Sequence, residues 1–129
     1  MRCGDTLLIP APGSEVTPHL WIIVTEPAPE THRCVIVSVT TLRHNKDQTV
    51  TLGIADHPFI RHPSIVFYAD AQIVDVRQLR ADVIARVAER REACSMELLK
   101  LVQAGVSASP FTPKKILAFC RQCWARQVT

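Results

Sequence analysis

The 129-residue chain lacks an apolar run long enough to cross a membrane. Its longest apolar stretches, such as residues 20–24, have the length of a strand, and its N-terminus lacks the charged-then-apolar pattern of a secretory signal. We therefore expect a soluble, cytoplasmic protein with no membrane partner. The chain is also too short for a barrel of eight βα units or for a dinucleotide-binding enzyme with a separate substrate domain, which leaves one compact domain.

A full set of metal ligands is also missing. The five cysteines include a Cys-x-x-Cys pair, Cys120 and Cys123, but no second Cys or His pair stands at ligand spacing. Because a structural zinc needs four ligands, we expect no metal and no cofactor. An odd number of cysteines without an export signal indicates reduced thiols, and two thiols three residues apart on a helix are typical apolar filler.

The net charge of +3 is small, but it is unevenly distributed. Residues 1–76 carry five Lys and Arg against eight Asp and Glu, whereas residues 77–129 carry ten against four. The basic part is either a surface that follows RNA phosphates or receives an acidic protein segment, or solubilising charge over helices. Its candidate residues are Arg77, Arg80, Arg86, Arg90, Arg91, Lys114 and Lys115.

The first part of the chain has the pattern of short strands. Apolar and β-branched residues gather in short runs bounded by turn residues, and residues 34–40 are so uniformly apolar that burial on both faces is expected. Residues 43–48 are polar and predict a surface loop. The predicted strands are residues 6–10, 19–24, 34–40, 49–52, 65–68 and 71–74.

The last part has a helical pattern. Apolar residues recur at helical spacing over residues 78–87, Ser95 is suited to cap a second helix that Gly105 ends, and Thr112 is suited to cap a third. The predicted class is therefore α+β, mainly β. We expect a small antiparallel barrel of five to seven strands at residues 1–79, followed by about three helices at residues 80–129 that pack on it.

The order of several motifs suggests a family. Gly4-Asp5 precedes the first strand, an apolar strand follows at residues 19–24, a third strand ends in Thr40-Thr41, and residues 64–79 are similar to a run of Ser-x-Val, Asp-Gln, Asp and Arg-Leu. In this order they resemble the PemK/MazF family of toxin endoribonucleases over roughly residues 2–79. The chain departs from the family pattern at His19-Leu20, where the family has Arg-Pro, at Tyr68, where it has a basic residue, and in its longer helical C-terminal part.

The resemblance implies a fold and an activity. The fold is an SH3-like barrel, and the activity is metal-independent cleavage of single-stranded RNA by a toxin of a type II toxin–antitoxin module. The implied partners are a cognate antitoxin and a second copy of the chain in a homodimer.

RNA cleavage by attack of the 2′-hydroxyl needs a base, an acid and a cation for the charge that develops on the phosphate. The segment around residues 57–70 contains all three kinds of side chain. We predict that a histidine acts as acid or base, that an arginine binds the scissile phosphate, and that an aspartate orients or activates a group. The predicted catalytic residues are His57, Arg61, His62 and Asp70.

A second set of residues is predicted to bind RNA. Hydroxyl groups would contact sugar or phosphate, a tyrosine would stack on a base or donate a proton, and the lysines in the first turn of the last helix would attract an anion because cations there oppose the helix dipole. These residues are His19, Thr40, Thr41, Ser64, Tyr68, Lys114 and Lys115.

Other interpretations of the same residues remain open at this point. The prolines after His57 and His62 hold both residues extended, so the segment is alternatively a rigid turn whose imidazoles bond to the backbone. The whole protein is alternatively a non-catalytic barrel that binds protein or nucleic acid, or a mobile-element accessory protein whose helical tail is the functional part. Convergence of His57 or His62 with Arg61 and Asp70 in one cleft would favour the enzyme.

Overall fold

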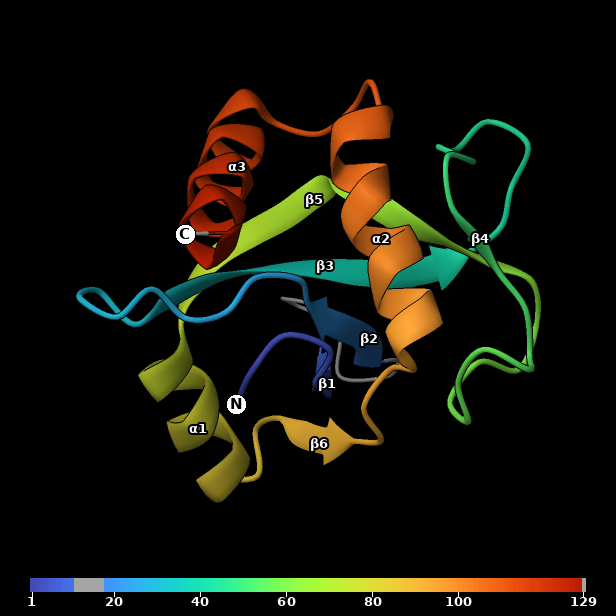
Figure 1. The fold of residues 1–129 in the computed structure, drawn as a ribbon. Helices are drawn as coiled ribbons and strands as arrows, with labels where there is room; N and C mark the ends of the chain where they lie inside the picture. Colours follow the sequence, from blue (N-terminus) through green and yellow to red (C-terminus); the bar gives the residue numbers. More distant parts are fainter. Residues whose placement is uncertain (11–17, 129) are drawn as a thin grey trace.

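Six strands and three helices follow one another in the computed structural model, which describes residues 1–10 and 18–128 (Figure 1). In chain order they are β1 (Thr6–Pro10), β2 (Pro18–Ile23), β3 (Arg33–Thr41), β4 (Thr51–Leu52), β5 (Ser64–Asp75), α1 (Val76–Ile84), β6 (Glu89–Arg91), α2 (Met96–Ala108) and α3 (Lys114–Val128).

The strands form one curled antiparallel sheet. Its order is β4-β5-β3-β2-β1-β6, so β4 and β6 are the two edges and the sheet is a half-barrel. The mixed α+β class, the number of strands and the number of helices agree with the expectation from sequence. None of the helices in the described ranges is long and apolar enough to span a membrane.

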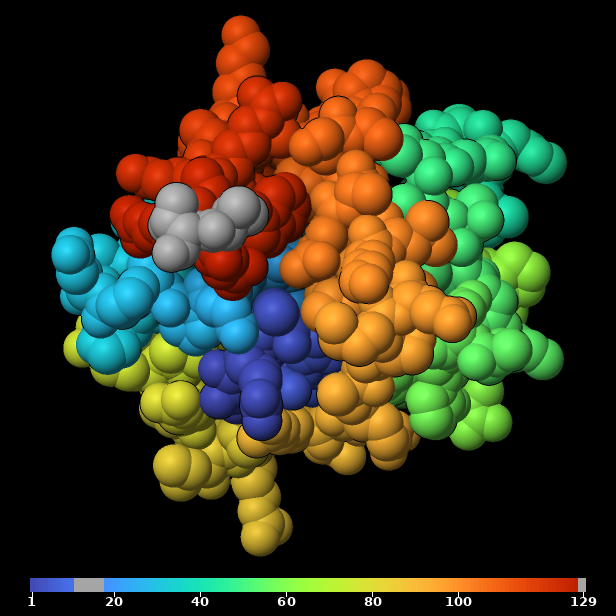
Figure 2. Space-filling model, viewed as in Figure 1, coloured from blue at the N-terminus to red at the C-terminus, as the bar shows by residue number. Residues whose placement is uncertain are grey.

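The core lies on both faces of the sheet. Val35 and Val37 of β3 pack in the cluster that α2 and α3 cover, whereas Cys34 and Ile36 pack in the cluster that α1 covers. The alternation of side chains along a strand produces this division. It confirms that β3 is buried on both faces. In the space-filling view, the surfaces of α2 (orange) and α3 (red) meet over the first of these faces (Figure 2).

The basic tail contributes to the sheet, which the sequence did not suggest. Its strand β6 pairs antiparallel with β1, Thr6 lying opposite Arg91. A three-residue charged strand carries no apolar alternation, so only its long-range partner specifies it. Helix α1 also begins before residue 79, at Val76, because Asp75 accepts a hydrogen bond from the Arg77 amide as its N-cap.

Two of the expected helix boundaries are wrong. Ser95 caps α2 as predicted, accepting from the Leu98 amide, but the helix passes through Gly105 and ends at Ala108. Gly105 therefore lies inside the helix. A glycine is needed there because a Cβ would overlap the Tyr68 hydroxyl and lie 2.7 Å from Val50 Cγ2. Thr112 does not cap α3, since its buried hydroxyl has no hydrogen-bond partner within the described ranges.

The polar loop at residues 43–48 is anchored through one carboxylate. Asp47 is buried and accepts hydrogen bonds from the Ser109 hydroxyl at 2.5 Å and from the Thr49 hydroxyl and amide. Burial alone would raise the pKa of Asp47, but the hydrogen bonds from Ser109 and Thr49 outweigh it, so its pKa is lower than usual. The loop is thereby fixed to the turn between α2 and α3.

Gly105→Ala is expected to lower the free energy of unfolding by about 3 kcal/mol, because the methyl group has no room beside Tyr68 and Val50. Urea unfolding measures this loss. At an open helix position, the change from Gly to Ala instead raises the free energy of unfolding by about 1 kcal/mol. Ala104 is exposed on the same helix, so Ala104→Gly measures this intrinsic difference between the two residues with the opposite sign. A Gly105→Ala protein as stable as the wild type would contradict the close contact.

Asp47→Asn is expected to lower the free energy of unfolding at neutral pH by about 1 to 3 kcal/mol, because a charged acceptor of three hydrogen bonds is lost. The folded-state pKa is lowered, so this stabilisation is complete above the unfolded-state pKa of about 3.9 and is lost as the pH falls through the folded-state value. Urea titrations at several pH values should show the wild type and variant converging in acid. A pH-independent difference would refute the assignment.

Candidate functional site

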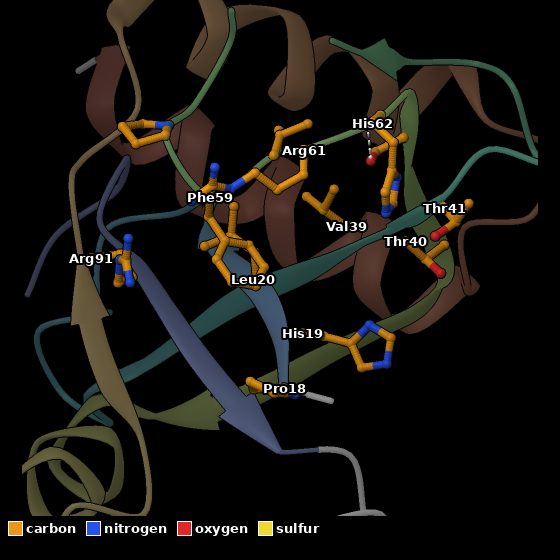
Figure 3. Close-up of a pocket in the computed structure, with 13 residues that line it drawn as sticks. Pro18, His19, Leu20, Val39, Thr40, Thr41, Phe59, Arg61, His62 and Arg91 are labelled. Carbon is orange, nitrogen blue, oxygen red and sulfur yellow. Dashed lines mark hydrogen bonds between the residues drawn. The ribbon is translucent and has the colours of Figure 1, made fainter. Parts of the chain in front are cut away.

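A pocket of about 370 Å³ lies where β2 begins and β3 ends (Figure 3). It is lined by side chains from β2, from the end of β3, from the segment that leads into β5, and from β6. Six of the site residues predicted from sequence line this pocket: His19, Thr40, Thr41, Arg61, His62 and Ser64.

The pairing of β3 with β5 positions the hydroxyl groups of the pocket. Thr41 lies opposite Ser64 in the register of these strands. The Ser64 hydroxyl donates to the His62 carbonyl at 2.9 Å, which fixes the turn into β5. The Nδ1 of His62 lies 3.4 Å from the Pro63 carbonyl oxygen. Because a carbonyl only accepts, Nδ1 carries the proton in this contact, and Nε2 is then available to accept one.

Among the described residues that line the pocket, every ionisable side chain is basic: His19, Arg61, His62 and Arg91. Arg91 comes from the tail. Its guanidinium lies 5.8 Å from the centre of the Phe59 ring. Guanidinium nitrogens of Arg91 also lie 3.7 Å from a Glu89 carboxylate oxygen and 3.8 Å from a Glu92 carboxylate oxygen. Sequence reasoning counted Arg91 with a basic helical surface and missed its place in the pocket, because the pairing of β6 with β1 that brings it there is long-range.

His57 lies inside the protein and is only 3% exposed. Its Nδ1 accepts from the Phe59 amide at 3.0 Å, so in the neutral ring the proton is on Nε2, which lies 2.6 Å from the Glu92 carbonyl and 3.3 Å from the Thr6 hydroxyl. Both nitrogens are engaged. The rigid-turn interpretation therefore describes His57, which ties the segment before β5 to β1 and to Glu92, the residue after β6. We do not assign it a catalytic role.

Three other predicted site residues lie away from the pocket. The Tyr68 side chain is buried and its hydroxyl donates to the Val102 carbonyl at 2.7 Å; burial and, to a lesser degree, Asp47 raise its pKa. No base can stack on a ring in this position. Lys114 and Lys115 are exposed at the start of α3 and do not line the pocket.

Asp70 lines a second, larger hollow instead. This groove, of about 780 Å³, lies on the sheet face beside α1 and includes side chains of Trp21 and Phe67. His19 and Thr40 line both the pocket and the groove, so the two hollows adjoin. The expected convergence in one cleft is therefore met only in part: Arg61 and His62 line the pocket, whereas Asp70 lines the adjoining groove.

The cysteine thiols are held in their protonated form. Burial raises the pKa of Cys34 and Cys120 to about 12 and that of Cys3 and Cys94 to about 11. It also raises the pKa of Cys123, against smaller opposite effects of Arg126 and Thr25. Metal ligands and nucleophiles need thiolates. Within residues 1–10 and 18–128, no group of three or more His, Cys, Asp or Glu side chains is arranged to hold a metal ion.

Neither a scan against protein-family models nor a search of the curated proteins gave a match. What the structure defines is a mixed α+β protein whose half-barrel sheet carries a basic, hydroxyl-lined pocket at the ends of its central strands.

The two histidines that precede prolines are expected to respond differently to substitution. His57→Ala should lower the free energy of unfolding by about 2 to 4 kcal/mol, because it leaves buried partners unsatisfied. His62→Ala, at an exposed position, should change it by less than about 0.5 kcal/mol. Urea unfolding of both variants measures the contrast, and equal losses of stability would contradict the structural role of His57.

Proposed function

We propose that the protein is an endoribonuclease that cleaves single-stranded RNA in this pocket without a metal ion. The observation that supports the proposal is the meeting of two histidines, two arginines and three hydroxyl groups in one pocket, with no acidic side chain among the described residues that line it. Such a pocket is suited to a phosphodiester, because arginine forks bind phosphate oxygens and histidines transfer protons near neutral pH.

His19 and His62 are the acid–base pair in this proposal. Figure 3 shows their rings on either side of Thr40, both at the wall of the pocket. One imidazole takes the proton from the 2′-hydroxyl as its oxygen attacks the phosphorus, and the other gives a proton to the departing 5′-oxygen. The products are a 2′,3′-cyclic phosphate and a 5′-hydroxyl end.

The other side chains of the pocket bind and stabilise. Arg61 and Arg91 supply positive charge for the oxygens of the phosphorane, whose charge grows in the transition state. Thr40 and Thr41 contact sugar or phosphate oxygens, whereas the Ser64 hydroxyl, which donates its proton to the His62 carbonyl, fixes the turn beside them. The proposal gives no chemical step to His57, Tyr68 or Asp70, and it leaves Lys114 and Lys115 as exposed sites that attract the RNA backbone from a distance.

The resemblance to the PemK/MazF family supplies the setting that we propose. In it, the half-barrel is a divergent SH3-like barrel, and the chain is the toxin of a type II module that acts as a homodimer in the cytoplasm and is neutralised by a cognate antitoxin. The replacement of the family's Arg-Pro by His19-Leu20 favours a second candidate, a barrel that binds RNA without cleaving it.

His62→Gln and Arg61→Ala should each reduce RNA cleavage about 100-fold or more, because the first removes a proton-transfer group and the second a charge on the phosphate. Cleavage of a single-stranded RNA in buffer containing a chelator, followed on a gel, measures the effect. His44→Gln and Arg121→Ala remove the same groups at exposed positions outside the pocket and should cleave like the wild type.

Full activity of His62→Gln and Arg61→Ala would contradict the catalytic assignment. Binding of the RNA by the wild type without any cleavage would instead favour the non-catalytic barrel.

A further inference from the structure

The groove beside the pocket has the lining of a binding site for flat apolar groups. Trp21 of β2 lies opposite Ser38 of β3, and Ser38 lies opposite Phe67 of β5, so one row across three strands carries an aromatic side chain on each side of a small residue. All three side chains line the groove. Its volume of about 780 Å³ is within the range of natural ligand pockets.

The groove adjoins the basic pocket. His19 and Thr40 line both hollows, so a chain molecule that places a phosphate between His19 and His62 extends directly over the groove. Single-stranded nucleic acids bind in this manner, with phosphates on cationic groups and bases stacked on aromatic side chains. The groove is therefore the nearest place for the bases that flank the scissile phosphate.

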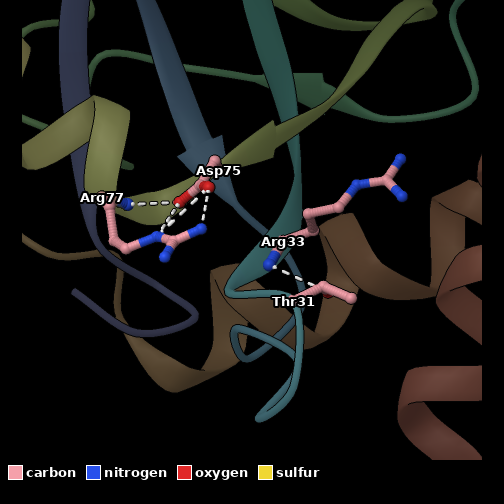
Figure 4. A network of polar contacts seen from close by, with 4 residues as sticks. All are labelled: Thr31, Arg33, Asp75 and Arg77. Atoms are coloured by element: carbon pink, nitrogen blue, oxygen red, sulfur yellow. Dashed lines mark hydrogen bonds and ion pairs between the residues drawn. The ribbon is translucent and has the colours of Figure 1, made fainter.

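The groove carries charges of both signs. Lys46 lines it, with its ammonium nitrogen 5.6 Å from the centre of the Phe67 ring. Three carboxylates also line it, and two of them have partners: Asp75 forms an ion pair with Arg77 at 2.7 Å (Figure 4), and Asp82 accepts from the Gln78 side chain at 2.9 Å. The hydrogen bonds from Arg77 hold the pKa of Asp75 at about 2. Asp70 is exposed, and within the described ranges its carboxylate makes no hydrogen bond or ion pair with another side chain.

We propose that the groove binds a base next to the scissile phosphate and that Asp70 selects guanine there. This inference rests on the proposed RNA cleavage. A carboxylate accepts through two adjacent oxygens. On the Watson–Crick edges of the four RNA bases, only guanine presents two adjacent donors, N1–H and the 2-amino group, whereas adenine, cytosine and uracil each place an acceptor next to a donor. Asp70 therefore attracts guanine and repels the other three bases.

The test uses single-stranded RNAs with a randomised sequence, cleaved by the full-length protein and sequenced at the new ends. The wild type should cut with guanine enriched at one fixed position beside the cleaved bond. Asp70→Asn should reduce that enrichment about tenfold, because an amide offers a single acceptor. Glu30→Gln removes the same charge from an exposed site outside both hollows and should keep the enrichment.

The outcomes separate this inference from the proposed function. Cleavage without guanine enrichment, or an Asp70→Asn protein that keeps the enrichment, overturns the groove assignment alone. If no RNA is cleaved, binding of fluorescently labelled oligomers of each base gives the answer: a guanine preference that Asp70→Asn removes supports the groove and contradicts the nuclease, and no binding overturns both.

Discussion

The antiparallel pairing of β3 with β5 is the interaction on which the rest of the structure depends. β3 is buried on both faces of the sheet, and its register with β5 sets Thr41 beside Ser64 at the pocket and Ser38 beside Phe67 in the groove. Between them the chain forms the two-residue edge strand β4, then leaves the sheet and returns to it in β5. That excursion carries the His-Pro segment, so the same pairing that builds the core also delivers Arg61 and His62 to the site.

Burial decides what each histidine of that segment does. His57 and His62 have the same local sequence, since each is followed by a proline that keeps it extended. His57 is enclosed and has partners on both ring nitrogens, so it fastens the excursion to β1 and to Glu92, the residue after β6. His62 is exposed at the pocket wall. The first holds the segment in place, and the second is thereby positioned at the wall of the pocket.

Local patterns predicted the regions of β1 to β5, the cap at Ser95 and six residues that meet in the pocket, because strand ends and turn residues determine where side chains gather. The predicted strands at residues 65–68 and 71–74 are one strand, β5, in the structure. They did not predict what depends on distant partners. Arg91 reaches the pocket only through the pairing of β6 with β1. Gly105 is not a helix stop; it is a glycine inside α2 that leaves room for the Tyr68 side chain. Nothing near either residue in the sequence records these contacts.

We propose that RNA binds in two hollows of different chemistry, with a phosphate in the basic pocket and a base in the aromatic groove. Central to this proposal is cleavage of RNA in the pocket by attack of the 2′-hydroxyl. The most direct measurement compares a single-stranded RNA with the same molecule lacking one 2′-hydroxyl at the cleaved position, both in chelator. We predict that the first is cut to a 2′,3′-cyclic phosphate and a 5′-hydroxyl end and that the second is not cut at that position. Cleavage of the deoxy-substituted position, or a 5′-phosphate end, would contradict the account.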